Sequence, residues 1–90
     1  MKSEAKNLDN TDLVYVQIDN WFSHHSPDSD QLERYELIRK TAKVMANVMV
    51  KTIPPCADRT SALRKLRETV MAANAAIACN EFNRSEWPQI

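Results

Sequence analysis

Basic residues are the part of this sequence whose type and spacing could do chemistry. Arg39 and Lys43 are four positions apart. Arg64 and Arg67 are three positions apart. Either spacing places both cations on one face when the segment is helical. Guanidinium groups donate in a fixed fork that fits phosphate oxygens, and their planes stack on nucleobases. The pattern therefore fits either a site for a phosphate-bearing ligand or an ordinary solvated helix face.

The charge of the chain is sorted into blocks. The 90 residues carry 12 basic and 12 acidic side chains, so the formal net charge is zero. Residues 1–38 hold three basic and eight acidic side chains, whereas residues 39–67 hold eight basic ones and Asp58 as their one acid. The eight are Arg39, Lys40, Lys43, Lys51, Arg59, Arg64, Lys65 and Arg67. A chain of zero net charge is not expected to bind long nucleic acid strongly, but such a basic block suits a small, multiply charged anion.

The sequence lacks the residue patterns of phosphate loops, metal sites and catalytic centres. The chain has no glycine, which excludes glycine-rich phosphate loops and the dinucleotide fingerprint. His24 and His25 are the two histidines, and nothing at a metal-ligand spacing completes a site with them. Cys56 and Cys79 stand apart, as expected of reduced structural thiols. Without a nucleophile-base grouping or a carboxylate pair, we expect no enzyme activity, no metal and no cofactor.

Aromatic residues gather near the N-terminal end. Four of them lie between positions 15 and 35: Tyr15, Trp21, Phe22 and Tyr35. They fit core or interface packing. A second interpretation is open, because an aromatic or imidazole ring beside converging arginines makes a platform on which a base stacks. His24 is likewise either an exposed loop residue or a ligand contact.

Apolar spacing between residues 29 and 53 predicts a long helix. The stripe recurs every three or four residues: Leu32, Tyr35, Ile38, Ala42, Met45, Met49 and Thr52. A second apolar edge, which suggests more than one neighbour, consists of Leu37, Val44 and Val48. Two pairs could form a capping box near Ser29, namely Asp28 with Gln31 and Asp30 with Glu33. The helix ends at Ile53-Pro54-Pro55, because proline cannot extend the hydrogen-bonded ladder.

A second helix is predicted to begin between Cys56 and Thr60 and to run to about Glu81. Its stripe is Leu63, Leu66, Val70, Ala73 and Ile77. The short connection makes the two long helices antiparallel neighbours, so the fold class is all-α, an antiparallel two-helix hairpin. Residues 13–22 precede it and fit either a short helix or an extended arm. Leftover apolar edges on so small a chain favour assembly into a homo-oligomer.

The domain organisation follows from composition. We expect a disordered N-terminus over residues 1–12, a helical hairpin domain over residues 13–81 and a C-terminal tail over residues 82–90. The first residues are polar and acidic, unlike a signal peptide. No apolar run approaches the roughly 20 residues of a membrane span. We therefore expect a soluble intracellular protein with no membrane partner.

Two blocks of the sequence resemble a known family. QIDNWFSHHSPDSDQLERYELIRKTAKVMA, followed by PPCADRTSALRKLRETVMAANAAIA, resembles the phage hairpin family shared by anti-CBASS and anti-Thoeris proteins. These small proteins are sponges for cyclic nucleotide second messengers. The most specific parts are the QIDxxF arm, the ERYxxIR start of the first long helix and ALRKLRExVMxANAAIA on the second. The resemblance covers about residues 16–81.

The resemblance implies a homohexamer of helical hairpins that does no chemistry. Cyclic dinucleotides, for example 3′,3′-cyclic GMP-AMP, would lie in pockets between protomers, and some members hold cyclic trinucleotides at a separate site. Such a protein acts in immune evasion. It sequesters the messenger in the cytoplasm of the infected bacterial host, so that CBASS-type effectors are not activated.

Roles for single residues also follow from the resemblance. His24 occupies the place of an aromatic ring that stacks on a base in other members. Arg39 corresponds to a basic residue that meets a phosphate or a base, and Thr41 resembles a position that helps hold the larger ring. Arg64 and Arg67 are candidates for trinucleotide phosphates. The predicted ligand-binding residues are Phe22, His24, Arg39, Lys40, Thr41, Lys43, Arg64 and Arg67.

Two other function classes stay open. A small phage regulator could bind DNA or RNA through the basic second helix, with a steep dependence on salt. Net neutrality and the absence of a recognisable helix-turn-helix disfavour it, as both helices are long and joined by Pro-Pro. A structural or inhibitory helical oligomer would use the charge block only as a subunit interface.

Overall fold

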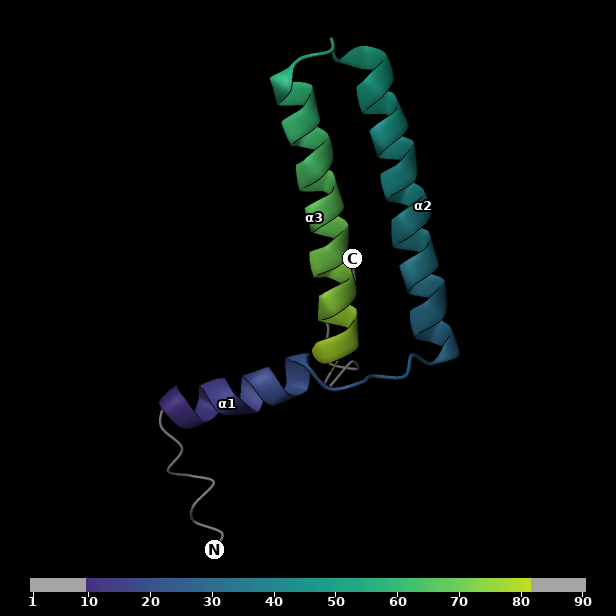
Figure 1. The fold of residues 1–90 in the computed structure, drawn as a ribbon. Coiled ribbons are helices and arrows are strands. Elements are labelled where there is room, and N and C mark those ends of the chain that lie inside the picture. Colours follow the sequence, from purple (N-terminus) through teal and green to yellow (C-terminus); the bar gives the residue numbers. More distant parts are fainter. Residues whose placement is uncertain (1–9, 82–90) are drawn as a thin grey trace, which may run out of the picture.

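The computed structural model describes residues 10–81, and their side chains from residue 12 onward (Figure 1). These residues form three helices and no strand, which confirms the all-α prediction. They are α1 (Asn10–Trp21), α2 (Ser29–Thr52) and α3 (Ala57–Cys79). None of these helices is long and apolar enough to cross a membrane. The predictions for residues 1–9 and for the tail, residues 82–90, lie outside the described residues.

The two long helices lie side by side and antiparallel, as the short connection predicts (Figure 1). α2 ends at Thr52 because Ile53 adopts extended backbone ahead of Pro54. The guanidinium of Arg59 donates to the Ile53 carbonyl at 3.5 Å and ties the connecting loop to the start of α3. α3 ends at Cys79, two residues before the predicted end.

Of the two capping boxes that the sequence allows, the structure forms the one between Asp28 and Gln31. The Gln31 backbone N–H donates to Asp28 Oδ1 at 2.7 Å, and the Asp28 N–H donates to Gln31 Oε1 at 3.0 Å. Asp28 has extended backbone, as an N-cap requires. Asp30 instead accepts from Arg34 Nε at 2.9 Å, one turn further along α2.

The segment that the sequence left undecided between helix and arm is helical. α1 begins at Asn10, so residues 10–12, which we placed in the disordered N-terminus, belong to a helix. Asp12 in its first turn suits the positive end of the helix dipole. α1 extends sideways from the lower end of α3, and the turn that follows it runs across the base of the hairpin to α2 (Figure 1). Its end is attached to α3, since Asn20 Nδ2 donates to the Cys79 carbonyl at 2.9 Å.

Most apolar side chains of the single chain face outward. Cys79, at 9% exposure, is the one buried residue among those described. The second apolar edge of α2 is uncovered, with Leu37 at 64% and Val44 at 63% exposure. In α1 the side chains of residues 12–19 are all exposed, and Leu13, Val14, Tyr15, Val16 and Ile18 are among them. Monomeric proteins rarely leave contiguous apolar surface of this kind in water.

We expect Asp28→Ala to lower the free energy of unfolding by about 1 kcal/mol, because it removes the side-chain acceptor of an N-cap. Chemical denaturation followed by circular dichroism measures the change. Ser29→Ala, at the exposed neighbouring position, is the matched control. An Asp28→Ala variant as stable as the parent would contradict the assigned cap.

Candidate ligand-binding site

Three of the predicted cations meet at a groove in the middle of the hairpin. Arg39 and Lys43 come from α2, and Arg67 comes from α3. The groove has a volume of about 240 Å³. Its other lining residues are small or apolar: Ala42, Ala46, Leu63, Leu66 and Val70. We call it the basic groove. Positive charge beside an apolar lining suits a ligand that carries both phosphates and planar bases.

Helical spacing and small side chains build the basic groove. Arg39 and Lys43 are one turn apart on α2, so both project from the same face. Ala42 and Ala46 are alanines at the α2 surface that faces α3, and small residues let two helices approach closely. The antiparallel pairing then sets Arg67 beside the two cations of α2. The grouping is a product of tertiary packing rather than of local sequence.

Glu36 partly neutralises the edge of the basic groove. Its carboxylate accepts a hydrogen bond from the Arg39 guanidinium and lies 3.6 Å from Lys40 Nζ. Arg39, and to a smaller extent Lys40, holds the pKa of Glu36 below its usual value. All three side chains are substantially exposed to water, so this pairing is weak. A phosphate oxygen can therefore replace Glu36 as the partner of Arg39.

Arg67 also borders a second polar groove, on the outer side of α3. Arg64, Glu68 and Met71 complete its lining, and its volume is about 340 Å³. Arg64 is absent from the lining of the basic groove, although it precedes Arg67 by only three residues. Arg67 therefore lines the same groove as the cations of α2, whereas Arg64 lines only the groove on α3.

Thr41 lies on a different face from its predicted companions. It lines an apolar groove of about 400 Å³ between α2 and α3. Two residues along a helix correspond to a rotation of roughly 200°, so Thr41 projects opposite to Arg39 and Lys43. The apolar groove is lined by Leu37, Ile38, Thr41, Ala42, Met45, Leu66, Thr69, Val70 and Ala73.

The three remaining predicted residues line none of these three grooves. Phe22, at 82% exposure, follows the last turn of α1. His24 sits in the turn between α1 and α2, where its Nε2 lies 3.1 Å from Ser26 Oγ. Lys40 is on the exposed side of α2 beside Glu36. One copy of the chain therefore does not bring Phe22 or His24 to Arg39.

Sequence reasoning missed two partners of the charged residues. Glu36 was not singled out, although its spacing of three and four from Arg39 and Lys40 is a recognisable ion-pair signal. Arg34 pairs with Glu81, which is 47 positions away and gives no local signal. Among the described residues no group of three or more metal-ligating side chains gathers.

The fold and the basic groove define a small helical hairpin protein with three cations along one groove between its long helices. The family model described as the Acb2/Tad1 hairpin domain matches residues 15–78, which are 64 of the 90 residues. The chain belongs to this family, and the resemblance drawn from its sequence motifs is confirmed. The family is associated with phage anti-defence sponges. No curated protein and no solved structure matches the chain.

We expect the titration midpoint of the Glu36 carboxyl to rise in Arg39→Ala, since the main cause of its lowered pKa is removed. A pKa that is lower in the folded state stabilises the fold above the unfolded-state value, and this contribution is lost as the pH falls through the folded-state value. Carboxyl carbon shifts in an NMR titration measure the midpoint. An unchanged midpoint would contradict the Glu36–Arg39 pair.

Proposed function

We propose that this protein is a non-enzymatic sponge for cyclic oligonucleotide second messengers. It binds cyclic dinucleotides such as 3′,3′-cyclic GMP-AMP, with cyclic trinucleotides as a second ligand class. It holds them in the cytoplasm of the infected bacterial host, so that CBASS-type effectors are not activated. The observation that carries the proposal is the convergence of Arg39, Lys43 and Arg67 on one groove, in a chain of the Acb2/Tad1 hairpin family.

The chemistry of the groove supports this ligand class. A cyclic dinucleotide carries two phosphodiester charges and two planar bases in a compact ring. The guanidinium groups of Arg39 and Arg67 can each donate two hydrogen bonds to phosphate oxygens. Lys43, which lines the same groove, adds a third positive charge. The alanine and leucine lining offers an apolar surface against which a base packs without losing hydrogen bonds. Long duplex DNA would need an extended cationic surface, which the neutral chain lacks.

The size of the basic groove supports a site completed by a second copy. Pockets for drug-sized ligands span about 300–1,000 Å³. The basic groove holds about 240 Å³, so one chain covers only part of a cyclic dinucleotide. The apolar edge that contains Leu37 and Val44 is exposed on the same helix. A homohexamer, as the family resemblance implies, would cover this edge and supply Phe22 and His24 from neighbouring copies.

The proposed activity ends at binding. In sequestration the ligand is bound and released without chemical change. The lining of the basic groove consists of cationic and apolar side chains and has no nucleophile paired with a general base. The lysine and arginine side chains stabilise phosphate charge in the bound state. A phosphodiester bond held by such groups, without an activated water, stays intact.

We expect Arg39→Ala to weaken binding of 3′,3′-cyclic GMP-AMP by about 10- to 100-fold, because it removes charge-assisted hydrogen bonds to a phosphate. Isothermal titration calorimetry measures the affinity. Lys51→Ala removes the same charge from the last turn of α2, away from the groove, and is the matched control. Full affinity of Arg39→Ala would remove Arg39 from the site. Binding of duplex DNA with no response to the cyclic dinucleotide would favour a nucleic-acid regulator.

We expect Glu36→Gln to strengthen binding of the same ligand by about two- to fivefold, because an exposed ion pair no longer competes for Arg39. The comparison is made by calorimetry at low and at moderate salt, and the gain should shrink as salt screens the charges. Weaker binding in Glu36→Gln would show that the carboxylate itself contacts the ligand.

A further inference from the structure

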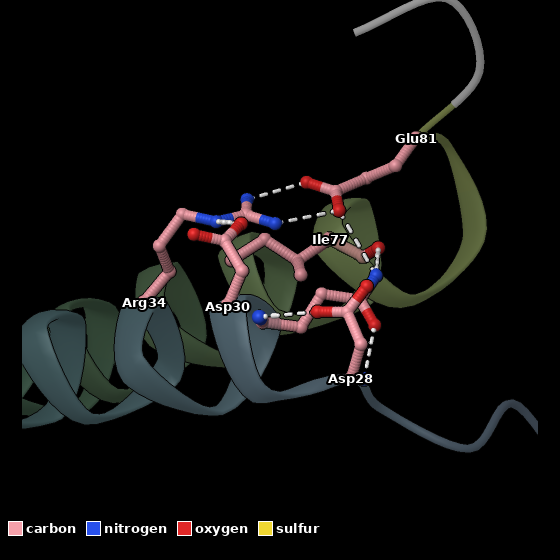
Figure 2. A network of polar contacts seen from close by, with 6 residues as sticks. Asp28, Asp30, Arg34, Ile77 and Glu81 are labelled. Carbon is pink, nitrogen blue, oxygen red and sulfur yellow. Dashed lines mark hydrogen bonds and ion pairs between the residues drawn. The ribbon is translucent and has the colours of Figure 1, made fainter.

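The base of the hairpin contains a polar network that Figure 2 shows at close range. Glu81 is the acceptor at its centre. Arg34 Nη1 donates to Glu81 Oε2 at 2.5 Å, and Arg34 Nη2 donates to Glu81 Oε1 at 2.7 Å. Gln31 Nε2 donates to Glu81 Oε1 at 2.9 Å. The Glu81 side chain is only 8% exposed, so these three bonds replace water around its charge.

The same network caps the end of α3 with side chains from the other two helices. An α-helix leaves its last carbonyl groups without intrahelical partners. The Ile77 carbonyl accepts from Gln31 Nε2 of α2 at 3.3 Å (Figure 2). The Cys79 carbonyl accepts from Asn20 Nδ2 of α1 at 2.9 Å. Both neighbouring helices are thereby fixed to residues 77–81.

These contacts hold the turn between α1 and α2 from both of its ends. Asn20 precedes the turn, and its own carbonyl lies 2.7 Å from His25 Nε2. Gln31 follows the turn and closes the capping box with Asp28, so one amide side chain joins the start of α2 to Glu81. The turn that carries His24 is therefore anchored to the end of α3 rather than to the middle of the hairpin.

We propose that Glu81 is a positioning residue of the ligand site, which sets the place of the turn that carries His24 by holding Gln31 and Arg34. This inference rests on the proposed function, in which that turn contributes to a pocket on a neighbouring copy. Glu81 does not touch the ligand. It fixes the start of α2, from which the turn that carries His24 leads back to α1.

The arrangement of donors makes the carboxylate difficult to replace. Both oxygens of Glu81 face N–H donors, two from Arg34 and one from Gln31. In Glu81→Gln, the new amide N–H groups would face the N–H groups of Arg34 or Gln31. Because neither side could then accept a hydrogen bond, the two side chains would move apart. The pairing also raises the pKa of Arg34 above its usual value, which reflects how strongly Glu81 favours the charged guanidinium.

The two histidines of the chain, His24 and His25, both lie in this turn and give a direct test. We expect Glu81→Gln to shift their imidazole NMR signals in the ligand-free protein, and to weaken binding of 3′,3′-cyclic GMP-AMP at least tenfold while the helical circular dichroism is retained. Glu33→Gln, an exposed carboxylate of α2, is the matched control and should change neither reading. Asn20→Ala releases the other end of the turn and serves as a second variant, with the same shift and loss expected.

Each outcome decides a separate point. Imidazole signals that stay in place in Glu81→Gln would overturn the positioning role of Glu81, whatever the ligand result and whether or not Asn20→Ala shifts them. Shifted signals with undiminished affinity would overturn the link between the turn and the ligand site. If the parent protein binds no cyclic dinucleotide, the proposed function fails and the ligand role of Glu81 fails with it, while shifted signals would still assign the turn to Glu81.

Discussion

The packing of α2 against α3 is the physical constraint at the centre of this structure. α2 and α3 pack through small and apolar residues, and this contact sets Arg39 and Lys43 beside Arg67. Glu36 offsets part of the charge from the exposed edge. A groove with this excess of cations attracts a multiply charged anion, because one such ligand can pair with several of the cations at once. Binding of a cyclic oligonucleotide is the function that fits this arrangement best.

The hairpin has two regions with different tasks. At its base, the carboxylate of Glu81 is almost removed from water and accepts from Gln31 and Arg34 of α2. Asn20 of α1 separately donates to the Cys79 carbonyl at the end of α3. In its middle, the charged groups are exposed and only loosely paired. In the proposed oligomer, the hydrogen-bonded base would hold the helices in one arrangement, so that the open, charged middle of each copy meets its neighbour at a defined angle.

Local signals in the sequence predicted the long helices well. Pro54 and the Asp28–Gln31 box act within a few residues of the helix ends they define, so α2 is found at almost its predicted bounds. α1 was harder, because the apolar residues of so short a segment fit both helical spacing and the alternation of an extended arm. The basic groove was predictable only in part. The spacing of Arg39 and Lys43 is local, but the choice of Arg67 over Arg64 depends on how α3 is rotated against α2, and Glu81 meets Arg34 across 47 positions.

The proposed function requires neighbouring copies of the hairpin to hold a cyclic anion that they do not alter. Native mass spectrometry of the protein mixed with 3′,3′-cyclic GMP-AMP tests this most directly, because one spectrum reports the number of subunits, the number of ligands and the mass of each ligand released. We predict an oligomer that carries the ligand and releases it with its original mass. A protein that stays monomeric and empty, or that releases a hydrolysed product, would contradict the proposed function.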